Sequence, residues 1–163
     1  MNRGAILRIV VLSVLGLARM SRADDSDEPS PWVKKSFVIL KSTGSYDEAH
    51  RFSIAAAKAL DARLDLRDLS PDKKVGLTFS RKACQHEIGS FPCYWPRGRF
   101  DDGVYVSIEY SNGYKGFKDG LYIVILANGG TEDENIKSAL RHARAIYPDA
   151  YVKTTPVYLG CVH

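Results

Sequence analysis

A near-repeat of 24 residues constrains the fold of this chain more than any other feature. When residues 37–60 are set against residues 123–146 without a gap, eight of the 24 positions are identical. The identical positions are Val38/Val124, Ile39/Ile125, Leu40/Leu126, Gly44/Gly130, Asp47/Asp133, Glu48/Glu134, Ala57/Ala143 and Ala59/Ala145. Self-similarity in a fixed register is typical of a repeated supersecondary unit. We therefore interpret the chain as two related halves.

Each half begins with a strand pattern and continues with a helix pattern. Apolar runs rich in strand-forming residues occupy 37–40 and 121–126. Ser45 and Thr131 each begin a capping box, in which a hydroxyl is followed three residues later by glutamate. Apolar residues then recur at helical spacing in both halves. A second strand is expected after each helix, at 62–66 and 150–158.

Two segments between the halves, 75–80 and 103–110, are also expected to be strands. In the second, Val104, Val106 and Ile108 alternate with Tyr105, Ser107 and Glu109 on the opposite face. Two strand–helix–strand units predict an α+β fold, a ferredoxin-like βαβ-βαβ sandwich. Its sheet is expected to be mostly antiparallel, with two helices on one face and extra strands inserted.

The first 23 residues have the pattern of a secretory signal peptide. Arg3 and Arg8 provide a basic start, residues 9–18 are uncharged and mostly apolar, and Ala23 ends a small-residue cleavage pattern. This run is too short to cross a bilayer, which needs about 20 residues; an uncleaved anchor is the alternative. We expect a cleavable signal at 1–23, a disordered acidic leader at 24–34 and a single domain at 35–163. The predicted location is the periplasm or cell envelope, with no integral membrane span after signal removal.

Removal of the signal changes the charge balance of the chain. Four of the 23 basic residues and none of the 19 acidic residues lie in 1–23, which leaves 19 of each. A chain without net positive charge lacks the electrostatic footprint of a nucleic-acid-binding protein. We therefore expect no nucleic acid among its partners.

The three cysteines allow one internal disulfide, with three possible pairings. Such bridges are permitted in an exported protein. We favour Cys84–Cys93, because both lie in the irregular segment 81–100, which has few other means of being held. Cys161 is then a free thiol or an intermolecular link, and its pairing with either of the others stays open. A catalytic Cys84, or a zinc site that includes His86, lacks a convincing base or fourth ligand. We expect no metal and no cofactor.

Aromatic residues crowd the segment 94–122, which holds eight of the seventeen in the chain. Rings with a polar tip suit a surface that binds while partly wet; alternatively, individual rings cover the helix-free face of the sheet or lie in the core. The candidate ligand-binding residues are Tyr105, Tyr110, Tyr114 and Tyr122 for stacking, and Ser107, Glu109 and Asn128 for hydrogen bonds. Arg97 and Arg99 form a small basic spot that meets a ligand carboxylate or is simply solvated.

The second half resembles a known family. Residues 121–153, LYIVILANGGTEDENIKSALRHARAIYPDAYVK, are similar to the second half of a SPOR (sporulation-related repeat) domain, and the ending YPDAYV at 147–152 matches its pattern. Residues 37–66 are similar to the first half. The resemblance implies a β-α-β-β-α-β sandwich that is exported and binds peptidoglycan glycan strands stripped of their stem peptides, through the sheet face and its rim. An insertion at about 67–119 separates the halves in this chain.

These observations predict an exported, non-catalytic module that binds peptidoglycan glycan strands through an aromatic sheet face. The alternative is a protein-interaction domain of the same fold without glycan binding, whose partner is another envelope protein. A hydrolase that uses the cysteine segment is a distant third hypothesis. A disulfide between Cys84 and Cys93 would remove its nucleophile.

Overall fold

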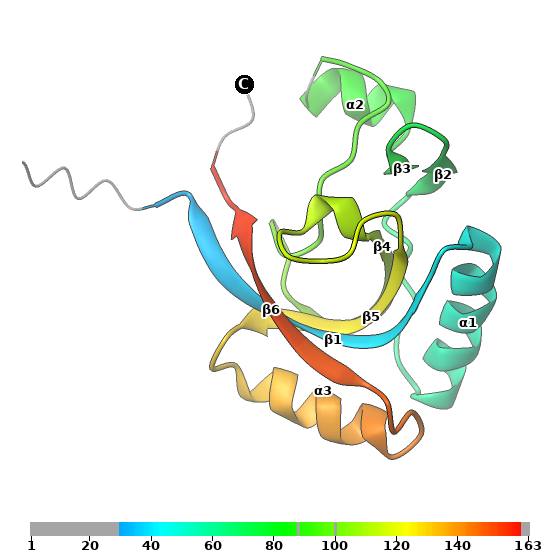
Figure 1. Ribbon diagram of the computed structural model, residues 1–163, viewed down its shortest axis with the longest axis vertical. Helices are drawn as coiled ribbons and strands as arrows, with labels where there is room; N and C mark the ends of the chain where they lie inside the picture. Colours follow the sequence, from blue (N-terminus) through cyan, green and yellow to red (C-terminus); the bar gives the residue numbers. More distant parts are fainter. Residues whose placement is uncertain (1–29, 88, 100, 161–163) are drawn as a thin grey trace, which may run out of the picture.

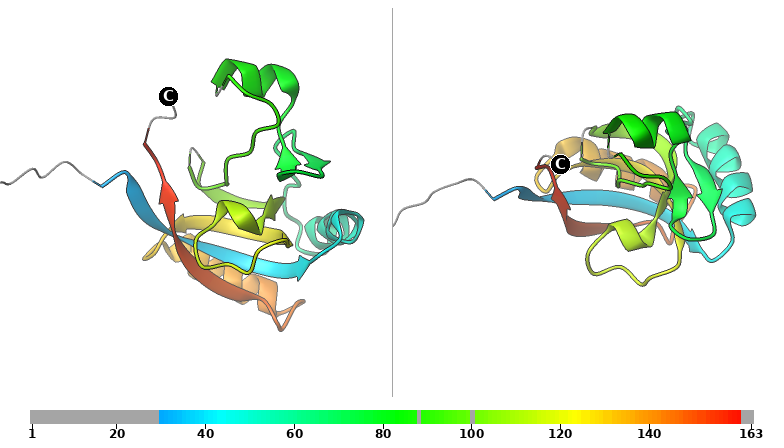
Figure 2. Two further views of the ribbon diagram at one scale, coloured as in Figure 1. Left: turned by 45° about the horizontal axis from the view of Figure 1, so that its top comes forward. Right: turned by 90° about the horizontal axis from the view of Figure 1, so that it is seen from above.

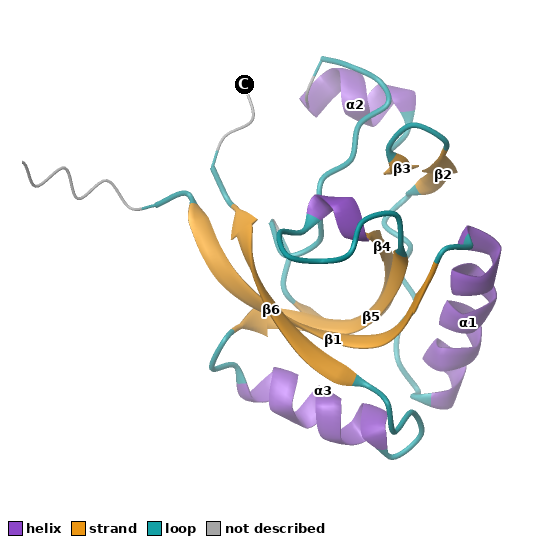
Figure 3. Ribbon diagram, in the orientation of Figure 1, coloured by secondary structure: helices purple, strands orange, loops and turns teal. Residues whose placement is uncertain are grey.

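The computed structural model describes residues 30–87, 89–99 and 101–160. The expected signal peptide, residues 24–29 of the expected leader, and Cys161 lie outside these residues. Figure 3 distinguishes the helices from the strands. In chain order the elements are β1 (Trp32–Thr43), α1 (Tyr46–Ala59), β2 (Ser70–Asp72), β3 (Gly76–Thr78), α2 (Arg81–Glu87), β4 (Gly103–Tyr110), the short 3-10 helix η1 (Ser111–Gly113), β5 (Tyr122–Gly130), α3 (Glu134–Arg144) and β6 (Tyr151–Tyr158).

A four-stranded sheet in the order β4-β5-β1-β6 forms the body of the fold (Figure 1), and every neighbouring pair is antiparallel. The two strand–helix–strand units are β1-α1-β4 and β5-α3-β6. Within each unit the two strands run parallel, with one strand of the other unit between them. This is the ferredoxin-like βαβ-βαβ order, so the predicted α+β class is confirmed. Strands β2 and β3 form a separate small sheet.

The register of β1 against β5 relates the two halves of the repeat. The equivalent residues Ile39 and Ile125 are direct partners across the two strands. The pairs Phe37–Asn128 and Ser42–Ile123 lie on either side of them, and each pair is the repeat counterpart of the other. A two-fold rotation about an axis near the isoleucines therefore exchanges the two halves.

Both helices cover the same face of the sheet, as predicted. Side chains alternate between the faces of a strand, so Val38, Leu40, Val124 and Leu126 point to one side. They pack in one buried cluster with Ala49, Ala56, Ile136, Ala139 and Ala143 of the two helices. Figure 2 shows α1 and α3 on the side of the sheet away from η1.

The two helix starts differ, although the repeat predicts the same cap for both. Before α1 the Ser45 hydroxyl accepts the N–H of Glu48 at 3.3 Å, as expected. Before α3 the cap is Asp133, whose carboxylate accepts the N–H of Asn135 at 2.9 Å. The capping box predicted at Thr131 is wrong, because β5 extends to Gly130 and Thr131 lies in the turn that follows it.

The strand predicted at 62–66 is also wrong. This segment makes an isolated parallel bridge from Leu64 to Val106, with Asp65 N–H donating to the Val106 carbonyl at 2.9 Å. Asp61 and Arg67 adopt left-handed φ values of 46° and 58°, which interrupt an extended chain at both ends. β4, which lies within the predicted insertion, takes the place in the sheet that was expected for this segment. It is therefore the second strand of the first unit.

The end predicted for the disordered leader, residue 34, is wrong, because β1 begins at Trp32. Residues 32–34, which were assigned to the disordered segment, pair with the end of β6. The rings of Trp32 and Tyr158, which are register partners, lie 5.1 Å apart. This aromatic cross-strand pair stabilises the ribbon at the start of the domain.

The helix-free face of the sheet is covered. Phe37, Ile39, Ile123, Ile125 and Val157 form a second buried cluster with Tyr114, which comes from the loop after η1. The Tyr114 and Phe37 rings are 5.1 Å apart. The Thr155 hydroxyl of β6 donates to the Lys115 carbonyl at 2.9 Å, which holds the loop across the sheet. The face expected to bind a ligand is therefore largely core.

Candidate functional site

The insertion builds a small subdomain with β2, β3 and α2 beside the end of β4 (Figure 1). One carboxylate oxygen of Asp72 accepts the N–H groups of Lys74 and Val75 at 2.7 and 3.1 Å, which fixes the hairpin turn between β2 and β3. Gly76 then packs against the Tyr110 ring of β4 so closely that a Cβ atom would lie 2.3 Å from it. This contact fixes the hairpin to the main sheet.

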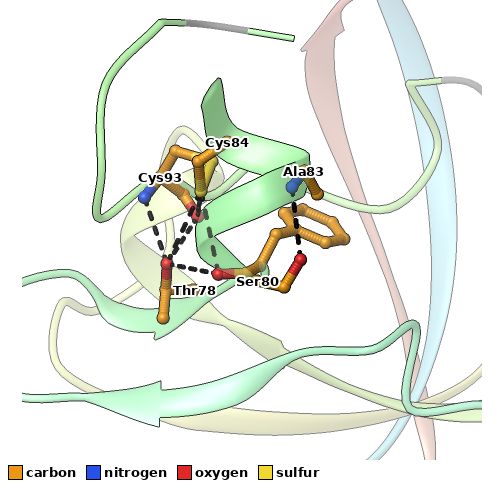
Figure 4. Close-up of a disulfide and its surroundings, with 6 residues drawn as sticks. Thr78, Ser80, Ala83, Cys84 and Cys93 are labelled. Carbon is orange, nitrogen blue, oxygen red and sulfur yellow. Dashed lines mark hydrogen bonds between the residues drawn. A yellow bond between two sulfur atoms is a disulfide. The ribbon is translucent and has the colours of Figure 1, made fainter. Parts of the chain in front are cut away.

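The predicted disulfide between Cys84 and Cys93 is present, and both residues are buried. Figure 4 shows that the Thr78 hydroxyl lies beside the bridge, where it accepts the N–H of Cys93 at 3.1 Å. The Ser80 hydroxyl accepts the N–H of Ala83 at 3.2 Å and caps the start of α2. Although the segment 81–100 was expected to be irregular, it begins with this helix. The bridge therefore joins β3, α2 and residues 90–93 into one unit.

Two adjoining pockets on this subdomain form what we call the insertion groove. The first, of about 500 Å³, is lined in part by Ser90, Cys93, Tyr94, Tyr110 and Asn112. The second, of about 510 Å³, is lined in part by Pro71, Asp72, Lys73, Arg81 and Phe91. Lys74 and Pro92 line both pockets. Aromatic, hydrogen-bonding and cationic side chains therefore line two neighbouring pockets that share two residues, and many ligand sites combine such groups.

The second pocket of the groove is cationic. Lys73, Lys74 and Arg81 are exposed there, and none of them forms an ion pair with a carboxylate in the described part of the chain. Among the residues whose side chains the structure describes, Asp72 is the one acidic residue that lines either pocket, and its turn contacts already engage one oxygen. The Arg81 guanidinium lies 4.2 Å from the centre of the Phe91 ring, which orients it.

An aromatic ridge continues from the first pocket across the end of the sheet. The ring of Tyr110 lies 5.2 Å from that of Tyr122, which lies 5.5 Å from that of Tyr46. All three residues are half-buried. The Tyr122 hydroxyl donates to the Gly76 carbonyl at 3.1 Å, so the ridge also supports the hairpin.

A buried ion pair anchors the covering segments to β4. The Glu109 side chain is fully buried and Arg67 is 10% exposed. One nitrogen of the Arg67 guanidinium lies 2.9 Å from each carboxylate oxygen. The carboxylate also accepts the hydroxyls of Tyr94 and Tyr114 at 2.7 and 3.1 Å, and the N–H of Arg97 at 3.0 Å. Four residues from three separate segments therefore donate to this one carboxylate.

Arg97 is buried rather than part of a basic surface spot. Its guanidinium donates to the carbonyls of Tyr105 and Gly103 at 2.8 and 2.9 Å and to the Ser107 hydroxyl at 3.0 Å. It also lies 3.4 Å from the centre of the Tyr105 ring. The expectation that Arg97 meets a ligand carboxylate at the surface is therefore wrong.

Burial sets the ionisation of the groups around Glu109. It raises the pKa of the Tyr94 and Tyr114 hydroxyls well above the usual value, and the charge of Glu109 adds to the effect. Both hydroxyls therefore remain donors. Burial lowers the pKa of Arg67, but the charge and hydrogen bonds of Glu109 outweigh burial, so the pKa lies above its usual value.

The raised pKa values predict that the protein loses stability in alkaline solution. Tyrosine ionises near pH 10 in an unfolded chain, whereas Tyr94 and Tyr114 stay protonated to higher pH when folded. Stability is therefore fully present below about pH 10 and falls as the pH rises toward the folded values, by about 1.4 kcal/mol per pH unit for each tyrosine. Urea unfolding at a series of alkaline pH values measures this slope. Tyr94→Phe should reduce it and the surface variant Tyr151→Phe should not; a flat profile contradicts the prediction.

The structure buries five of the seven predicted ligand-binding residues: Tyr105, Ser107, Glu109, Tyr114 and Asn128, each at most 4% exposed. Asn128 donates to the Asp101 carbonyl and the Asp102 carboxylate, both at 2.8 Å, so it holds a loop. The interpretation of Tyr105 and Tyr114 as stacking platforms is overturned, because protein atoms already cover their rings. Tyr110 and Tyr122 remain half-buried on the ridge, and Tyr110 lines the groove.

Sequence reasoning missed the groove residues Lys73, Lys74, Arg81 and Phe91. Two basic pairs, at 73–74 and 81–82, flank the short strand β3 and were an available signal. Nothing local indicates that the first pair and Arg81 line one pocket, because the disulfide and the hairpin determine that contact.

Comparison with protein-family models, with curated proteins and with solved structures finds no match. The chemistry of the site therefore rests on the side chains of this chain. Cys84 and Cys93 are bonded to each other, so neither offers a thiolate. Within the described residues no group of three or more His, Cys, Asp and Glu could hold a metal ion. None of the helices in that part of the chain is long and apolar enough to cross a bilayer.

A smaller pocket of about 330 Å³ lies between α3 and the segment that follows α1. Its two basic side chains have partners within the protein: Arg63 pairs with Asp65 at 2.7 Å, and a ring nitrogen of His142 lies 3.1 Å from the Leu60 carbonyl. The insertion groove is the stronger candidate, because none of its cations forms an ion pair with another described residue.

Proposed function

We propose that this chain is an exported, non-catalytic module that binds peptidoglycan glycan strands, and that the strand lies in the insertion groove. The observation that carries the proposal is the presence, in the two pockets, of aromatic and hydrogen-bonding side chains beside cations that form no ion pair with another described residue. Glycan sites combine apolar ring faces with a few polar groups that orient the sugar. The disulfide and the Asp72 turn hold both walls of the groove in place before a ligand arrives.

The groove replaces the sheet face as the proposed binding surface. Tyr114 packs on Phe37, and the loop that carries it is tied to β6. A ligand would have to displace this loop and its core contacts to reach the sheet. The groove needs no such rearrangement, because Lys73, Lys74 and Phe91 are already exposed.

Sedimentation with purified peptidoglycan sacculi tests the proposal. The wild-type chain should sediment with sacculi, and more with sacculi whose stem peptides have been removed by an amidase. Phe91→Ala should weaken binding by roughly threefold to tenfold, because an aromatic contact typically contributes about 0.5–1.5 kcal/mol. Phe91 is 37% exposed, so its removal leaves the core intact.

Trp32→Ala is the matched control. Trp32 is 42% exposed and also lies under a cation, with Lys115 Nζ 3.5 Å from its ring centre, but it lies outside the groove. The Trp32→Ala variant should bind sacculi as tightly as the wild type does. Failure of the wild type to bind either form of sacculus rejects the proposal and leaves the protein-interaction domain as the alternative. Loss of binding in Trp32→Ala alone rejects the groove as the site.

A further inference from the structure

The two pockets of the insertion groove differ in chemistry. The first contains Tyr94, Tyr110 and the Asn112 amide, which suit an uncharged sugar ring. The second contains Lys73 and Arg81 beside Phe91. Lys74 lies at the boundary and lines both. The groove therefore has an uncharged end and a cationic end. This arrangement suits a ligand in which a sugar ring lies next to an anionic group.

The cationic end is a local feature of the molecule. Basic and acidic residues are equal in number from residue 24 onward. Several other cations of the described residues have a carboxylate partner, including Lys35 with Asp102, Lys41 with Glu48 and Arg67 with Glu109. Among the described side chains that line the groove there are three cations, Lys73, Lys74 and Arg81, and one carboxylate, that of Asp72. Like charges placed together repel one another, so an anionic ligand at this end would relieve the repulsion as well as pair with the cations.

The geometry of Arg81 favours an anion with two oxygens. Its guanidinium carbon lies over the Phe91 ring, 4.2 Å from the ring centre, and a guanidinium has five N–H donors, so contact with a ring face leaves donors for an anion. A planar fork of donors matches the two oxygens of a carboxylate. The flexible ammonium groups of Lys73 and Lys74 can approach the same anion from the hairpin side.

We propose that the insertion groove recognises acidic glycans: a sugar ring occupies the pocket of Tyr94 and Tyr110, and its carboxylate lies between Lys73, Lys74 and Arg81. This inference rests on the proposed function and narrows it to a glycan that carries free carboxylates. In a glycan strand without stem peptides these are the lactyl carboxylates. The groove would then distinguish such a strand from a neutral polymer of the same sugars.

Titration of the full chain with three probes tests this inference. The probes are a stem-peptide-free glycan tetrasaccharide, the same tetrasaccharide with its carboxylates reduced to alcohols, and a neutral tetramer of N-acetylglucosamine. The acidic tetrasaccharide should bind at least tenfold more tightly than the reduced one, and this preference should shrink as salt rises. Lys74→Gln combined with Arg81→Gln should remove the preference, so that this variant binds the acidic and the reduced tetrasaccharide with equal affinity.

The matched control is Lys58→Gln combined with Arg141→Gln, which removes two exposed cations from the helices. It should keep the preference for the acidic probe. Equal binding of the acidic and reduced tetrasaccharides overturns the carboxylate inference and leaves the groove as a glycan site. Binding of none of the three probes overturns the proposed function as well. A separate titration with a glycerol-phosphate polymer tests the other class of anion: tighter binding of this polymer than of the acidic tetrasaccharide overturns the inference in favour of a phosphate ligand.

Discussion

Glu109→Gln is expected to lower the free energy of unfolding by about 3–5 kcal/mol, because removal of one member of a buried ion pair leaves the other charge uncompensated. Glu109 is fully buried and Arg67 is 10% exposed, so water cannot replace the lost carboxylate. The amide also cannot accept from Arg67, Tyr94, Tyr114 and the Arg97 N–H together, because it has one acceptor oxygen. A loss of this size is a large part of the stability of a typical domain. Urea unfolding of the two proteins measures the change.

A double-mutant cycle separates the ion pair from the packing around it. Arg67→Met with Glu109→Gln removes both charges and should recover part of the stability lost by Glu109→Gln alone. Glu134→Gln, which breaks the exposed pair of Glu134 with Lys137 on α3, is the matched control and should change stability far less. Equal, small effects of Glu109→Gln and Glu134→Gln would show that Glu109 does not anchor the covering segments.

Removal of the disulfide is the second change expected to have a large effect. Cys84→Ser with Cys93→Ser opens a loop with a sequence separation of 9, and a bridge of this length typically contributes about 2–3 kcal/mol. Ser90 and Phe91 lie within the loop, so the groove should lose its shape together with the bridge. We expect the free energy of unfolding to fall by this amount and acidic glycan binding to weaken at least tenfold.

Urea unfolding and the glycan titration measure the two consequences separately. Cys161→Ser is the matched control, because it removes a cysteine and leaves the bridge intact. Reduction of the wild-type protein should reproduce the effect of the double substitution. If the double variant keeps full glycan affinity while losing stability, the bridge stabilises the subdomain but does not shape the binding site.

The elements of the main sheet follow from local patterns, with two informative exceptions. The alternating residues of 103–110 form β4 with the predicted bounds, and the Ser45 cap begins α1 as expected. The pattern at 62–66 fails because left-handed residues on either side interrupt it. The cap at Thr131 fails because β5 continues past the point where the repeat predicts its end. Propensity describes the preference of a segment, and tertiary pairing decides where the segment stops.

Prediction of the site was weaker than prediction of the fold. Alternation in β4 correctly places Tyr105, Ser107 and Glu109 together on the helix-free side. It does not show whether that side is open. Residues 94–97 and Tyr114 bury the three side chains, and the partner of Glu109, Arg67, is 42 residues earlier in the chain. A polar face that was expected to bind a ligand is instead the polar interior of the domain.

The order of residues alone was enough to predict the duplicated strand–helix unit and the α+β class, because hydrophobic period and turn chemistry act between residues close in the chain. It favoured Cys84–Cys93 among three possible pairings, and the structure shows that bridge. Only the tertiary structure decided which aromatic side chains are exposed and where cations gather that form no ion pair within the described part of the chain. Burial of a side chain and the field around it depend on segments distant in sequence that fold over it. The insertion covers the sheet face, and the same insertion brings Lys73, Arg81 and Phe91 together at one groove.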